Sequence, residues 1–218
     1  MKISVILEAL TGRFETDIKR ASKESERAFR RMKSEANAAA KVIGASLATA
    51  AAGAAYAIKG AIDEMDQISK TAQKIGTTTE ALSALQYAAK LSDVSVGQLQ
   101  AGMTRLVRAQ AEAARGTERY VDLFGAIGVA ALNADGSLRN SADVMTDLAD
   151  VFASLPDGAT KTALAVELLG RSGADLIPLL NGGATGLAEM RIEAERLGLV
   201  ISGEAGRAAE EFNDNLTR

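Results

Sequence analysis

Only two prolines occur in the 218 residues of this chain, and this scarcity constrains its fold more than any other feature. Proline interrupts helices, so a chain almost free of it and rich in Ala, Leu, Glu, Lys and Arg favours helix along nearly its whole length. Aromatic residues make up only 4% of the sequence and Trp is missing, so the apolar contacts are small and helices can approach closely. We predict an all-α protein with an extended N-terminal helical arm, an Ala/Gly-rich helix and a small multi-helix domain.

The sequence contains no Cys and no His, which removes several kinds of functional site. Without Cys there are no disulfides, thiolate metal ligands or thiol nucleophiles. Without His, the usual general base near neutral pH and the commonest zinc ligand are missing. A pair of carboxylates of the glycosidase kind would need neither residue. We interpret the scattered Asp and Glu as solvated helix faces and predict no enzyme activity and no catalytic, cofactor-binding or metal site.

Charge is unevenly distributed along the chain. Residues 1–60 carry 11 Lys and Arg against 6 Asp and Glu (net +5), whereas residues 61–218 carry 14 against 22 (net −8). This pattern indicates a basic arm on an acidic body, but no aromatic residues alternate with the basic ones, so we predict no specific nucleic-acid recognition. Only Lys2 precedes a short apolar stretch that Glu8 interrupts, so we expect no signal peptide and assembly in the cytoplasm.

The first zone, residues 1–41, is the basic arm. It opens with an alternation of apolar residues over positions 3–9 that is compatible with a short strand. A weak heptad-like seam follows, which favours either a modest coiled coil or a solvated helix lying on its own body. We expect Phe14, Ile18 and Met32 to make the contacts of this arm. The seam residues are Phe14, Ile18, Ala21, Ser25, Ala28 and Met32.

The second zone, residues 42–62, is an Ala/Gly-rich helix. Residues 42–58 are uncharged over 17 positions, a helix of about 25 Å at 1.5 Å per residue, just short of a bilayer core. Small residues recur every four positions and permit close helix contact. An oligomeric helix, a conditional membrane segment and a packed core helix are all open, and we favour the first. We expect Gly44, Ala48 and Gly53 to lie at close helix crossings.

The third zone, residues 63–218, is predicted to be a small domain of short amphipathic helices. Thr77 with Glu80, and Ser95 with Gln98, have the spacing of capping boxes. Turns are predicted at 134–136, 156–158 and 181–183. We expect core positions in Leu82, Leu85, Ala89, Val96, Leu99, Met103, Leu106, Val107, Val144, Leu148, Val151, Phe152, Leu155, Leu176, Ile177, Leu180, Leu187, Met190, Ala194, Leu197, Ala205, Ala208, Ala209, Phe212 and Leu216.

Two short motifs resemble ligand-binding loops but lack residues that such loops require. Residues 170–173 (GRSG) lack the phosphate-loop pattern and follow no predicted strand. Residues 133–136 (NADG) resemble part of a calcium loop, but the terminal Glu that such a loop requires is missing. We interpret the second motif as a polar turn.

Several segments of the third zone resemble the helical region of tailed-phage tail tape measure proteins. They keep their order within residues 63–218, and the most specific is GRSGADLIPLL at 170–180. The resembling segments are 82–91 (LSALQYAAKL), 94–99 (VSVGQL), 162–180 (TALAVELLGRSGADLIPLL) and 210–216 (EEFNDNL).

The resemblance implies a helical protein in the lumen of a growing phage tail. Members of this family set tail length by their own length, are held by tail assembly chaperones and leave the tail ahead of the DNA. The implied partners are further copies of the chain, tail tube and tail tip proteins, those chaperones and, during ejection, the host membrane. The implied locations are the host cytoplasm during assembly and then the virion tail lumen.

Family members are usually much longer than 218 residues, with long helical tracts after the matched region. We therefore expect this chain to be an N-terminal fragment or a truncated gene product, and the length-measuring role to belong to a longer parent. Two other classes stay open at this point. One is a membrane-active, channel-forming protein acting through residues 42–58, and the other is a cell-wall-cleaving enzyme with a carboxylate mechanism.

Overall fold

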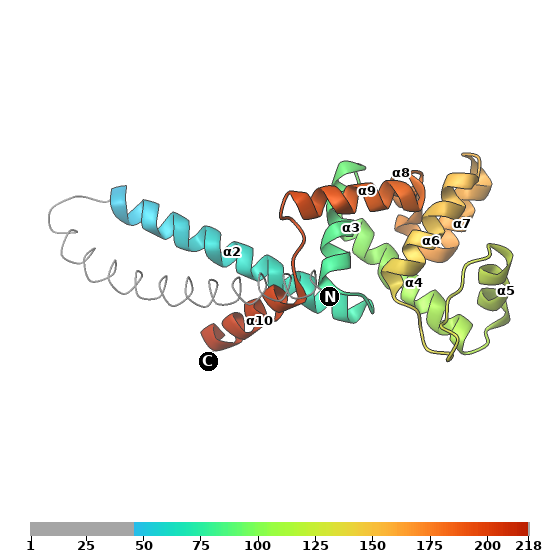
Figure 1. Cartoon of the computed structure of the whole chain (residues 1–218), viewed down its shortest axis with the longest axis horizontal. Helices are drawn as coiled ribbons and strands as arrows, with labels where there is room; N and C mark the ends of the chain where they lie inside the picture. The colour runs from blue at the N-terminus through green and yellow to red at the C-terminus, as the bar shows by residue number, and fades with distance from the viewer. Residues whose placement is uncertain (1–45, 218) are drawn as a thin grey trace, which may run out of the picture. The chain divides into compact units, whose positions relative to one another are not determined.

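The computed structural model describes the backbone of residues 46–217 and the side chains of residues 58–216 (Figure 1). The pattern of contacts divides the chain into two units, Met1–Lys59 and Gly60–Arg218. Regular structure in the described residues is helical, apart from one isolated bridge between Leu132 and Leu138. The all-α prediction is confirmed.

The helix predicted over residues 42–62 is part of a longer element. Helix α2 is described from Ser46 and continues without a break to Lys74. Residues 42–45 and the whole predicted arm over residues 1–41, with its strand and its seam, lie outside the described residues. Among the helices that the structure describes, none combines the length and the apolar character needed to cross a membrane.

The second unit contains the end of α2 and all the helices that follow. After α7, the 3-10 helix η1 leads directly into the short helix α8. The bounds are α3 (Thr79–Leu91), α4 (Val96–Ala114), α5 (Glu118–Ala126), α6 (Ser141–Ser154), α7 (Ala159–Leu169), η1 (Arg171–Leu176), α8 (Ile177–Leu180), α9 (Gly183–Arg196) and α10 (Gly203–Thr217).

Helix α4 is the centre of this unit. It contacts α3, α5, α6, α7 and η1 (Figure 1). Its predicted stripe Leu99, Met103 and Leu106 is fully buried, and Ala109 continues it. Burying a side chain of this size stabilises the fold by about 1.5–3 kcal/mol, so this stripe is a main source of the unit's stability.

The helix starts of α3 and α4 follow local capping rules, with one correction. Ser95 and Gln98 form the predicted capping box at the start of α4. The predicted N-cap Thr77 is wrong, because α3 is capped by Thr78, whose hydroxyl accepts from the Ala81 amide. The Thr77 hydroxyl instead donates to Asn140 Oδ1 over 2.9 Å and ties the start of α3 to the N-cap of α6.

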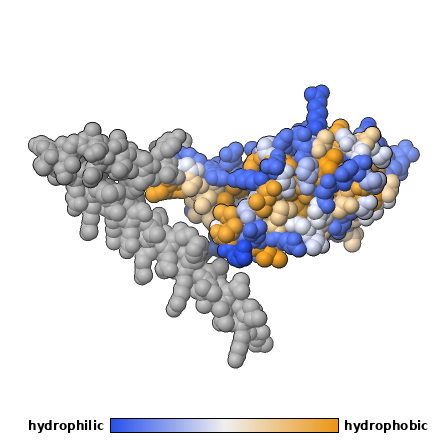
Figure 2. Space-filling model, turned by 90° about the horizontal axis from the view of Figure 1, so that it is seen from above, coloured by the Kyte–Doolittle hydropathy of each residue, from blue (hydrophilic) through white to orange (hydrophobic). Residues whose placement is uncertain are grey.

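Many of the predicted core residues are buried, but four of them, Leu197, Ala208, Phe212 and Leu216, are exposed. Leu197, at the end of α9, is 53% exposed, and Phe212 and Leu216 of α10 are 42% and 59% exposed. Apolar side chains accordingly reach the surface in several places between hydrophilic ones (Figure 2). The amphipathic pattern places Ala209, Phe212 and Leu216 on one face of α10, but the core prediction is wrong for Ala208, Phe212 and Leu216, because no described helix covers the last two turns.

Helices α2 and α10 form an antiparallel pair. A Cβ added to Gly206 would lie 2.8 Å from the Cβ of Ser69, so the two helices nearly touch there. Seven residues further along α10, Asn213 Nδ2 donates to Asp66 Oδ2 over 3.0 Å. Along α2, Asp66 comes before Ser69, whereas along α10 the partner of Asp66, Asn213, comes after the partner of Ser69, Gly206. The two helices therefore run in opposite directions.

Acid should loosen this pair. Burial pushes the pKa of Asp66 upward, but hydrogen bonds from Lys70 and Asn213 outweigh it, and the pKa lies below the ordinary value. A carboxylate with a lowered pKa stabilises the folded state above its unfolded pKa of about 3.9, and that contribution disappears as the pH falls through the folded pKa. We expect hydrogen exchange in α10, corrected for intrinsic rates, to accelerate below about pH 4 relative to α4.

An Asp66→Asn variant is the control for this effect. The variant should show faster hydrogen exchange in α10 already at pH 6, and its exchange should not accelerate further below about pH 4. If hydrogen exchange in α10 of the variant accelerates equally below about pH 4, another carboxylate causes the acid effect.

Candidate functional site

A shallow pocket of about 140 Å³ opens between α3, α6 and α9. Leu85 and Leu187 contribute to its floor, and Asp143, Thr146 and Arg191 are its polar lining residues. The rest of the lining is alanine: Ala81, Ala84, Ala88, Ala142, Ala184 and Ala188.

The alanines explain why a hollow exists at this place. On α3 they fall at positions 81, 84 and 88, a spacing of three and four that places them on one face. Their short side chains leave space that Leu or Phe would fill at the same positions. Helix α9 is held across this face from α6, because Asp150 Oδ1 accepts the amide hydrogen of Ala184 at 2.6 Å, in the first turn of α9.

Two of the polar residues of the pocket interact within their own helices. The Thr146 hydroxyl donates to the Ala142 carbonyl at 2.9 Å within its own helix. The guanidinium of Arg191 pairs with Glu195 at 3.0 Å. The pocket approaches the roughly 150 Å³ of a cavity that holds a benzene ring, so it has room for one apolar group of that size.

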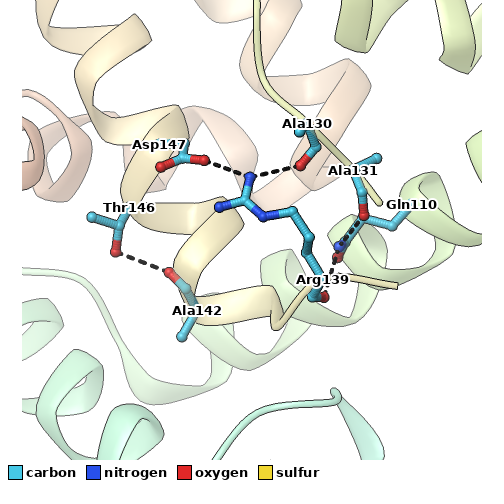
Figure 3. Close-up of polar contacts among 7 residues, drawn as sticks. All are labelled: Gln110, Ala130, Ala131, Arg139, Ala142, Thr146 and Asp147. Carbon is cyan, nitrogen blue, oxygen red and sulfur yellow. Dashed lines mark hydrogen bonds and ion pairs between the residues drawn. The ribbon is translucent and has the colours of Figure 1, made fainter. Parts of the chain in front are cut away.

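A second polar cluster holds the long loop between α5 and α6 (Figure 3). Arg139 Nη1 donates to the Ala130 carbonyl at 2.8 Å and pairs with Asp147 Oδ2 at 2.7 Å. From α4, Gln110 Nε2 donates to the carbonyls of Ala131 and Arg139 at 3.2 and 3.0 Å. These bonds satisfy backbone groups of a loop that lacks helical partners, so we interpret the cluster as structural.

Replacing Gln110 with Leu should therefore be costly. Gln110 is almost fully buried, and the change would leave two carbonyls without this donor. An unsatisfied buried polar group costs about 1–3 kcal/mol, so we expect a loss of that size in urea unfolding and faster hydrogen exchange across residues 127–140. The exposed Gln67 of α2 provides the matched change, Gln67→Leu, which should cost almost nothing. Equal losses in the two variants would contradict the structural role of Gln110.

The two motifs rejected at the sequence level have structural explanations. Asp135 Oδ1 accepts from the amide and hydroxyl of Ser137, which lowers the pKa of Asp135 and forms the predicted polar turn. Gly170 ends α7 with φ 74°, and a Cβ on Gly173 would lie 2.1 Å from the Ala165 carbonyl oxygen. The GRSG run is thus a close packing contact. In the described part of the chain, no group of three or more acidic residues could hold a metal ion.

The association residues predicted from the sequence belong to the first unit. Phe14, Ile18, Met32 and Gly44 lie outside the described residues. Ala48 and Gly53 lie on the described backbone of α2, but the surroundings of their side chains do not belong to the described part. The alanine pocket was not predicted, although the run of alanines at 81, 84 and 88 was a visible signal.

Comparison with known proteins adds no relative to this picture. No family model matches the chain, and neither a curated protein nor a solved structure matches it.

Proposed function

We propose that this chain is a structural and assembly protein of the tail tape measure type, which acts by binding other proteins. The observation that carries the proposal is the ordered resemblance of residues 82–99, 162–180 and 210–216 to that family. All of these segments fall in the second unit, and nearly all of their residues are helical. Enzyme activity has no part in the proposal, because the sequence has neither the His nor the Cys that most often serves as general base or nucleophile.

The resembling segments explain a shared fold better than a shared partner. Leu82, Leu85, Leu168, Leu176 and Leu180, all within these segments, are buried. They pack against α4 and its neighbours, so they are not free to contact another protein. Partner contacts of the second unit should therefore involve other surfaces, and the alanine pocket between α3, α6 and α9 is one of them.

In this proposal the chain lies in the lumen of the tail and is bound by tail tube, tail tip and assembly chaperone proteins. Copies of the chain associate through the small residues of the uncharged segment 42–58, with Gly44, Ala48 and Gly53 at the crossings.

Pull-down with purified tail tube and tail chaperone proteins from the same genome tests the proposal. We expect the full chain to bind at least one of them. Ala188→Trp, which adds bulk at an exposed position of the pocket, should weaken binding, whereas Ala101→Trp on the exposed face of α4 should not. A chain that is monomeric and binds none of these proteins would contradict the proposal.

Self-association is tested separately by light scattering. We expect a discrete oligomer whose mass falls in Gly44→Leu and Gly53→Leu variants, because a Leu side chain separates helices that touch through glycine. An oligomer of unchanged mass in both variants would assign the contact to other residues.

A further inference from the structure

The antiparallel pair of α2 and α10 is closed on one flank and open on the other. The pair touches through Ser69 and Gly206 and through Asp66 and Asn213. On the closed flank, the charge of Lys70 lies near Glu210 and Asp214, and these carboxylates help to raise the pKa of Lys70 after its hydrogen bond with Asp66. The opposite flank has a different chemistry.

The helical spacing places apolar residues of both helices on that opposite flank. On α2, Ile62 and Met65 are three residues apart and Ser69, at the contact with α10, follows four residues later. On α10, Ala209, Phe212 and Leu216 have the same spacing, so each set shares a face. With about 100° per residue, Met65 lies about 140° around α2 from Lys70, and Phe212 about 160° around α10 from Asp214. Because the two charged faces meet on one flank, the two apolar faces lie together on the other.

This apolar stripe is covered at one end only. Ala209 and Ser69 are buried, next to the contact of α10 with α3. Further along, Ile62 and Met65 are only half-buried and Phe212 and Leu216 are exposed. The stripe therefore continues an established helix contact into a face that lacks a third helix in the described part of the chain.

Acidic residues border the open end on both sides. Glu64 precedes Met65 on α2, and Glu211 precedes Phe212 on α10, and both are exposed. Each lies about 100° beyond its apolar neighbour, on the side away from the α2–α10 contact. A helix lying in the stripe would have a carboxylate along each edge.

We propose that the stripe of Ile62, Met65, Phe212 and Leu216 is a docking face for an amphipathic helix of a partner protein, with basic residues flanking its apolar side. The apolar residues supply burial and the two glutamates select the charge of the partner. A second copy of the same face would bring carboxylates against carboxylates, so charge disfavours it as the occupant. This inference deepens the proposed function and rests on it only for the premise that the chain works by binding proteins.

The test uses the full chain and a fluorescein-labelled designed helix of about 21 residues, long enough to be helical when bound, with Leu along one face and Lys on both flanks. Fluorescence anisotropy should show saturable binding, weakened at least tenfold by Phe212→Ala with Leu216→Ala. Alanine keeps the helix propensity of α10, and circular dichroism checks that the fold remains. The matched control, Leu197→Ala with Leu199→Ala, removes two other exposed leucines and should leave the affinity unchanged.

Charge reversal provides the second arm. The double variant Glu64→Lys with Glu211→Lys should bind the basic helix at least tenfold more weakly at low salt. It should also bind an otherwise identical helix that carries Glu in place of Lys. The proposal is overturned if both helices bind the unaltered chain equally, or if the Phe212 and Leu216 variant keeps full affinity for the basic helix. It is also overturned if that variant dissociates an oligomer of the chain while its affinity for the basic helix stays the same.

The two proposals fail separately in these experiments. If the chain binds tail proteins but not the basic helix, only the docking face is refuted. If it binds the basic helix through this face but no tail protein, the docking face stands and the tape measure assignment is refuted.

Discussion

Replacing Phe152 with alanine should lower the free energy of unfolding by about 3–5 kcal/mol. Phe152 lies on α6, which packs against α4, α8 and α9, and its side chain has no exposed surface. The change removes apolar burial and leaves a cavity that the surrounding helices fill only in part. Because a domain of this kind is stable by about 5–15 kcal/mol, this single change should remove a large share of its stability.

Urea unfolding followed by far-ultraviolet circular dichroism measures this loss, since the chain has no Trp to report by fluorescence. The chain also offers a matched control in Phe212, which is 42% exposed on α10. Phe212→Ala should cost less than about 1 kcal/mol, as surface changes do. Similar costs for the two variants would mean that α6 is not packed as described.

The second large effect is expected at Gly173. A methyl group there would lie 2.1 Å from the carbonyl oxygen of Ala165 and 3.1 Å from the Cβ of Leu169. The first of these atoms belongs to the backbone of α7 and cannot rotate away, so α7 and η1 would have to separate. We expect Gly173→Ala to cost about 3 kcal/mol, at the upper end of overpacking changes.

Gly125→Ala in α5 is the control for that prediction. A Cβ on Gly125 meets no atom within 4 Å, and alanine is favoured over glycine in a helix by about 0.5–1 kcal/mol. The control should therefore be neutral or slightly stabilising in the same urea unfolding. A Gly173 variant as stable as this control would contradict the close contact between α7 and η1.

Features set by neighbouring residues could be predicted from the sequence. The capping box of Ser95 and Gln98 depends on residues three apart, and the structure confirms it. The start of α3 was predicted one residue early, because Thr77 and Thr78 are equally suited to cap a helix. The choice depends on Asn140, 63 positions away, which takes the hydroxyl of Thr77.

Features that depend on which helices meet could not be predicted from periodicity. The pattern of α10 identifies its apolar face, but whether Phe212 and Leu216 are buried depends on whether another helix covers them. The alanine pocket has the same origin, because alanines on α3 predict either close packing or a hollow. The position of α9, fixed by Asp150 of α6, decides between them.

The contacts between α2 and α10 also determine when during synthesis this part of the fold can form. The Asp66 side chain on α2 meets its partner Asn213 across 147 positions, and Ser83 accepts the amide hydrogen of Ile201 across 118. At about 5–20 residues per second on the ribosome, Asp66 emerges roughly 7–30 s before Asn213. During that interval the part of α2 around Asp66 and Ser69 lacks the helix that contacts it, so a newly made chain exposes this surface to aggregation or to a helper protein until α10 is released.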